Sequence, residues 1–117
     1  MGFLVAADYS AQIRNEVMAV LKQPEGSLNL AEQMAQAEIE SYLRAADYNV
    51  TAIFSATGTS RNAKIIMVMV DLVIYHLQSH LVTRLMSTNR QKRYDDVLTW
   101  LTKVSKNEVD PNLPKLV

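Results

Sequence analysis

Two histidines one helical turn apart are the residues best spaced to do chemistry in this chain. His76 and His80 would lie on the same face of a helix and could bind one metal ion from there. A metal site needs further ligands, and the residues between the two histidines lack the glutamate of a zinc-protease helix. Ordinary structural histidines are the better interpretation, so the sequence predicts no metal site.

Asp71 is the most unusual single residue, because it lies in the middle of a long apolar stretch. A buried carboxylate costs several kcal/mol unless a partner compensates its charge. The functional interpretation is a general base or a proton-coupled site. The structural interpretation is a buried bond to Arg93, to Tyr94 or to a tyrosine of the first two helices. Since no nucleophile or second carboxylate is close in the sequence, we predict a buried polar pair of Asp71 and Arg93.

Arg90, Lys92 and Arg93 form a basic cluster that could contact phosphate. Asp95 and Asp96 follow at once and weaken its field, and no aromatic residues alternate with the bases as single-strand stacking requires. Twelve basic residues oppose twelve acidic ones among the 117 residues, so the chain has no basic excess. The cluster is better interpreted as the solvated start of a helix. No phosphate-binding loop is present either, and we predict no cofactor and no enzymatic activity.

Apolar residues at helical spacing predict four helices that must position these side chains. Asn29 precedes the second helix and Glu32 follows three residues on, which is a capping-box arrangement. The third helix is apolar on nearly every side, so it should be buried all round at the centre of the fold. The predicted helices run from about Asp8 to Lys22, Leu30 to Ala46, Asn62 to Leu85 and Arg90 to Ser105.

The third helix also contains the most apolar window of the chain, residues 65–85, which is long enough to suggest a membrane span. Polar and charged side chains interrupt that window, namely Asp71, His76, Gln78, His80 and Arg84. We therefore predict a buried core helix and no membrane contact. The absence of cysteine excludes disulfides and is compatible with a reducing cytoplasm.

The expected architecture is one all-α domain over residues 1–117. Its four-helix bundle-like core covers about residues 8–105, and a non-helical tail covers residues 106–117. An extended loop of about fourteen residues joins the second and third helices, longer than most loops in a compact domain. Its apolar residues Val50, Ile53 and Phe54 either tuck under the core or are offered to a partner. The tail contains two prolines after residue 109, which predicts an extended, protruding segment.

The zero net charge hides an asymmetry between the two halves of the sequence. Residues 1–58 carry a net charge of −4, and residues 59–117 carry a net charge of +4. The two halves can neutralise each other by folding together. An acidic face of one copy can also lie against a basic face of the next, which would suit a self-assembling subunit.

Over most of its length the sequence resembles the small head–tail connector (neck adaptor) proteins of Mu-like phages and prophages. The order and spacing of three blocks carry much of the resemblance. Ala6 stands where these proteins usually open the first helix with Ser or Thr, which predicts a weaker cap. An arginine common after their second helix is missing, so its role does not carry over. The three blocks are Tyr75-His76-Leu77, Arg93-Tyr94-Asp95-Asp96 and the proline-bearing tail from Val109 to Pro114.

The resemblance implies a structural protein of the virion neck, present in the bacterial host cytoplasm during assembly. About twelve copies would form a ring beneath the portal protein. The ring would extend the DNA conduit without recognising sequence and would present a platform to a tail or stopper protein. Residues 50–60 and 109–117 would be arms that reach a neighbour. The candidate assembly contacts are Val50, Ile53, Phe54, Arg90, Lys92, Pro111, Leu113, Pro114 and Leu116.

An alternative function from the residues alone is a small helical DNA-binding or regulatory module. Residues 84–93, which include the basic cluster, would then be the contact surface.

Overall fold

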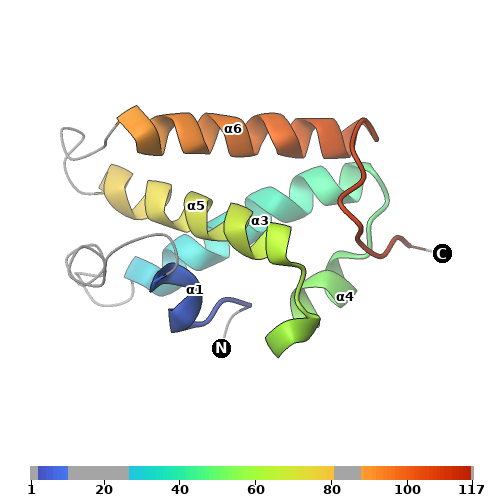
Figure 1. Cartoon of the computed structure of the whole chain (residues 1–117), viewed down its shortest axis with the longest axis horizontal. Helices are drawn as coiled ribbons and strands as arrows, with labels where there is room; N and C mark the ends of the chain where they lie inside the picture. The colour runs from blue at the N-terminus through green and yellow to red at the C-terminus, as the bar shows by residue number, and fades with distance from the viewer. Residues whose placement is uncertain (1–2, 11–26, 81–87, 117) are drawn as a thin grey trace.

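The described part of the chain is built from helices, as the sequence predicts (Figure 1). The computed structural model describes residues 3–10, 27–80 and 88–116. Of the first predicted helix only residues 8–10 lie in these ranges, and of the third predicted helix only residues 62–80 do; the rest of both predictions falls outside them. The α-helices are α1 (Ala6–Ser10), α3 (Ser27–Ala45), α4 (Val50–Ser55), α5 (Ala63–His80) and α6 (Thr88–Ser105), with a 3-10 turn η1 (Gly58–Ser60).

Helix α5 is the centre of the fold, and α3 and α6 both pack against it and against each other. Eight of its apolar side chains are buried, distributed around most of its circumference. The facing stripe of α3 is Ala31, Ala35, Ile39 and Leu43, whose small alanines allow close approach. The facing stripe of α6 is Val97, Leu101 and Val104. None of the described helices is long and apolar enough to cross a membrane.

The predicted capping box at Asn29 and Glu32 is wrong. Helix α3 already includes Ser27, so both residues lie inside its first turns. Glu32 instead accepts a hydrogen bond from the hydroxyl of Tyr9, which is buried beneath α3. Burial and this bond raise the pKa of Tyr9. The Glu32 carboxylate, which the local pattern predicts as part of a cap, thus makes a tertiary contact instead.

Two long helices end in left-handed residues that are not glycine. Asp47 has φ 63° after α3, and Asn107 has φ 60° after α6. After α3, the N–H of Tyr48 donates to the carbonyl of Leu43 at 3.1 Å, and the N–H of Asp47 donates to Arg44 at 3.1 Å. The same bond pattern closes α6. These are Schellman ends, which Asp and Asn tolerate best after glycine.

The connector that the sequence predicts as a loop contains α4 and η1. Asn49 caps α4, because its side-chain oxygen accepts a hydrogen bond from the N–H of Ala52 at 3.1 Å. Ile53 is buried, and the ring of Phe54 meets the ring of Phe3 edge-on at 5.1 Å. The sequence left two outcomes for the apolar residues of this segment, burial under the core or exposure to a partner. Ile53 is buried.

Arg61 joins the N-terminal segment to the connector. Its guanidinium donates to the carboxylate of Asp8 at 2.7 Å and to the carbonyl of Phe3 at 3.0 Å, while its Nε donates to the carbonyl of Gly58 at 2.9 Å. Asp8 also accepts the N–H of Val5 at 2.7 Å, so a carboxylate three residues into α1 caps the helix that Ala6 opens. Both ionic side chains are nearly buried.

We expect Arg61→Ala to lower the free energy of unfolding by about 2–3 kcal/mol, since it leaves the poorly solvated Asp8 carboxylate without its charged partner and removes the side-chain donor to the Phe3 carbonyl. Urea denaturation followed by circular dichroism measures the loss. Arg44→Ala is the matched control, because the Arg44–Glu40 pair lies on the surface and should contribute little. Equal losses in the two variants would contradict a special role for Arg61.

The Asp8 carboxyl should also make stability depend on pH. Burial alone would raise its pKa, but hydrogen bonds from Arg61 and Val5 and the guanidinium charge hold the pKa below its ordinary value. The resulting stability is present above about pH 4 and is lost as the pH falls through the folded pKa. We expect Asp8→Asn to be less stable than the parent at pH 7, with a difference that shrinks towards pH 3. A difference independent of pH, measured by urea denaturation, would contradict this.

Candidate functional site

The two segments expected to act as arms lie side by side at one end of the molecule (Figure 1). The N–H of Asn49 donates to the carbonyl of Pro114 at 2.9 Å, and the N–H of Leu116 donates to the carbonyl of Asp47 at 2.8 Å. Tyr48 and Lys115 form an antiparallel bridge between these bonds, and the Lys115 ammonium lies 4.9 Å from the centre of the Tyr48 ring. The tail is non-helical as predicted, but it lies along the start of α4 and does not protrude.

A groove of about 310 Å³ separates the two arms at this end. Three candidate contacts line it: Ile53 from α4, and Leu113 and Pro114 from the tail. Asn62 links the tail to the residue before α5, since its side-chain amide donates to the carbonyls of Pro111 at 3.2 Å and Asn112 at 3.4 Å. The complete lining is Ala52, Ile53, Ala56, Ser60, Asn62, Asn112, Leu113 and Pro114.

The candidate assembly contacts at the arms differ greatly in exposure. Pro111 and Ile53 are buried and hold the arms against the helices. Val50, Phe54 and Leu113 are half-buried against the core. Pro114 is exposed, and Leu116 is 60% exposed, the highest value among the large apolar side chains of the described residues. Leu116, and the groove that Leu113 and Pro114 of the same tail line, are therefore the apolar surface that this end offers. We call Leu116 and this groove the arm end.

Of the two basic residues predicted as assembly contacts, Lys92 lies on the exposed face of α6. Its ammonium pairs with Asp96 at 3.2 Å, one helical turn on. The side chain of Arg90 lies outside the described residues.

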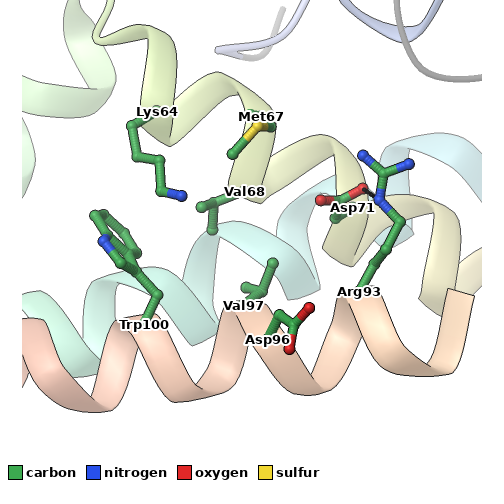
Figure 2. Close-up of a pocket in the computed structure, with 8 residues that line it drawn as sticks. All are labelled: Lys64, Met67, Val68, Asp71, Arg93, Asp96, Val97 and Trp100. Atoms are coloured by element: carbon green, nitrogen blue, oxygen red, sulfur yellow. Dashed lines mark ion pairs between the residues drawn. The ribbon is translucent and has the colours of Figure 1, made fainter. Parts of the chain in front are cut away.

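The structure brings Asp71 and Arg93 together. Asp71 is 5% exposed, and its carboxylate forms an ion pair with Arg93 Nε at 3.2 Å, although Arg93 itself remains partly exposed. The pair stands at one end of a second groove, of about 260 Å³, between α5 and α6 (Figure 2). At the other end the Lys64 ammonium lies 5.0 Å from the centre of the Trp100 ring. We call this the α5–α6 groove; its lining is Lys64, Met67, Val68, Asp71, Arg93, Asp96, Val97 and Trp100.

An aromatic cluster near the Asp71–Arg93 pair fixes α6 against α5. The rings of Tyr75 and Tyr94 stack with centres 3.7 Å apart and planes 11° from parallel. Burial raises the pKa of Tyr94, and the nearby charge of Glu38 adds to the effect. Glu38 also bonds to His76, so this histidine has a structural partner. Among the described residues no three acidic, histidine or cysteine side chains gather to hold a metal ion.

Sequence reasoning missed Asn62 and Arg61 as residues that position the arms. Asn62 was only the expected start of the third helix, and its side-chain oxygen does accept the N–H of Ile65 at 3.1 Å. Its second role, holding the tail, spans 49 residues of sequence. An asparagine directly before a long apolar run is a local signal for a cap, but no local signal points to the tail.

Comparison with known proteins gives a family for the whole arrangement. The family model described as "Bacteriophage Mu, Gp36" matches residues 4–116. That range includes both arms, both grooves and every helix described above. No curated protein and no solved structure matches the chain.

We expect Asp71→Asn to lower the free energy of unfolding by about 1–3 kcal/mol, because it removes the charge of a buried carboxylate that is paired with Arg93. Thermal and urea denaturation measure the loss. Asp96→Asn, in the same groove but exposed, is the control and should change stability by no more than about 0.5 kcal/mol. An Asp71→Asn variant as stable as the parent would contradict a structural role for the pair.

Proposed function

This chain belongs to the bacteriophage Mu Gp36 family, and we propose that it is a connector of the virion neck that joins the head to the tail. Membership of the family supports a structural or assembly role in a Mu-like phage. The observation that carries the finer proposal is the arm end. Two segments distant in sequence meet there, form a groove between them and leave Leu116 of the tail exposed. Exposed apolar surface at a built groove suits docking onto another protein.

The proposed assembly is a homo-oligomeric ring of about twelve copies around the DNA conduit. Its partners are the portal protein on one side and a tail or stopper protein on the other. DNA passes through without sequence recognition, which a chain of zero net charge favours, since it holds phosphate only weakly. The proposed connector acts by docking onto its partners, and no catalytic step is proposed. The place of action is the virion neck after assembly in the host cytoplasm.

The contacts of the basic cluster favour the connector over a DNA-binding module. Lys92 pairs with Asp96, and Arg93 pairs with Asp71. Each pair cancels much of the positive field that phosphate binding would use.

The experiment mixes the purified chain with portal rings from the same phage and follows binding by native mass spectrometry and negative-stain imaging. We expect a ring of copies on the portal. Leu116→Ser should weaken this binding about tenfold, because it removes an apolar side chain that docking would bury, and should leave the melting temperature unchanged. Gln91→Ser is the control: Gln91 is exposed near the start of α6, at the opposite end from the tail (Figure 1).

A chain that stays monomeric beside the portal and shifts duplex DNA in a gel would overturn the connector proposal in favour of the DNA-binding module. Equal portal binding by Leu116→Ser and the parent would show that the arm end is not the docking surface.

A further inference from the structure

We propose that neighbouring copies in the ring join through helix α3 of one copy, which lies in the α5–α6 groove of the next. This inference rests on the proposed function, because it describes how the subunits of that ring would meet. It arises from two surfaces that the connector proposal does not use. One is the α5–α6 groove, and the other is an exposed apolar stripe on α3.

The α5–α6 groove has an apolar floor and charged ends. Val68 and Val97 form the buried floor, and Met67 (39% exposed) and Trp100 stand at its sides (Figure 2). Lys64 is at one end, and the ion pair of Arg93 with Asp71 is at the other. Grooves between helices with an apolar floor are where an amphipathic helix docks. The chemistry therefore fits the apolar stripe of a helix with an acidic side chain for Lys64.

The groove opens on the face of the molecule away from α3. Helix α3 packs against both α5 and α6, yet none of the eight lining residues belongs to it. In Figure 2 the ribbon of α3 passes behind the two helices that bear the labelled side chains. The groove and the outer surface of α3 are thus on opposite sides of the three-helix bundle.

The outer surface of α3 carries large apolar side chains that the core does not use. Leu30 is 49% exposed and Met34 is 41% exposed, and Ala37 and Ser41 continue the same line at helical spacing. At 3.6 residues per turn this line is nearly opposite the buried stripe that begins with Ala31. We call Leu30, Met34, Ala37 and Ser41 the α3 stripe.

Charge supports a second copy as the occupant. Helix α3 carries three acidic residues, Glu32, Glu38 and Glu40, against one basic residue, Arg44, and the half of the sequence that contains α3 has a net charge of −4. Lys64 stands at one end of the groove with its ammonium over the Trp100 ring, in the half of the sequence with a net charge of +4.

Opposite placement of a stripe and a groove on one molecule has a consequence for symmetry. Each copy would present its α3 stripe to one neighbour and its α5–α6 groove to the other. Such a head-to-tail contact repeats around a closed ring, whereas a self-complementary contact would stop at a dimer.

The chain has no cysteine, so introduced cysteines report this contact cleanly. Met34→Cys and Met67→Cys are made in separate copies, mixed, assembled on portal rings and oxidised. We expect disulfide-linked dimers from the mixture and few from Met34→Cys alone. A chain carrying both substitutions should give a ladder of linked oligomers. Gln91→Cys mixed with Met67→Cys is the control, since Gln91 is exposed but lies outside the α3 stripe, and it should not link.

A second pair of variants tests the contact without cysteines. Met34→Lys places a charge against the apolar floor and should weaken ring formation at least tenfold with an unchanged melting temperature. Asn29→Lys adds the same charge beside the α3 stripe, and should leave ring formation unchanged.

The outcomes separate this inference from the proposed function. Rings on the portal with no Met34–Met67 link, and full assembly by Met34→Lys, would overturn the inference and leave the connector standing. Links between Met34→Cys copies alone would replace the head-to-tail contact with a symmetric dimer. A chain that forms no ring and does not bind the portal would contradict both proposals.

Discussion

The fold depends on one constraint: α5 is apolar around most of its circumference and must be covered on every such side. Burying these side chains is the main favourable contribution to folding. Helices α3 and α6 cover α5 over much of its length, and Asp71, the one charged residue among the buried side chains that the structure describes, is paired with Arg93. The arrangement of the other helices follows from this need. The surfaces left for assembly are then those that the covering helices turn outward.

The long helices could be predicted because their apolar residues repeat at helical spacing over many turns. The expected fourth helix, Arg90 to Ser105, matches α6 to within two residues. Local patterns failed where a distant residue decides the structure. The predicted cap at Asn29 is wrong because α3 already includes Ser27, and Glu32 bonds to Tyr9, 23 residues away. The ends at Asp47 and Asn107 carry no glycine signal, although both residues are left-handed.

For the candidate site, the sequence indicated the right segments but not their arrangement. A carboxylate within an apolar helix predicts a partner, and Arg93 is beside Asp71 in the structure. The connector and the tail were both expected to be arms, yet nothing local shows that they meet. Their meeting depends on backbone bonds from Asn49 and Leu116 that link segments more than sixty residues apart. Pro111 and Ile53 serve the fold by burial, which leaves Leu116 as the exposed contact.

The distribution of charge along the chain links the fold to the proposed assembly. A net charge of zero is the sum of an acidic half that contains α3 and a basic half that contains α5 and α6. Intramolecular pairs such as Asp8 with Arg61 use part of this difference, and the proposed ring would use more. The most direct test of the connector is cryo-electron microscopy of the neck of virions that carry this gene, with mass spectrometry of the same particles. We expect a ring of these helical subunits between the portal and the tail. Purified, infectious virions that lack the chain would contradict it.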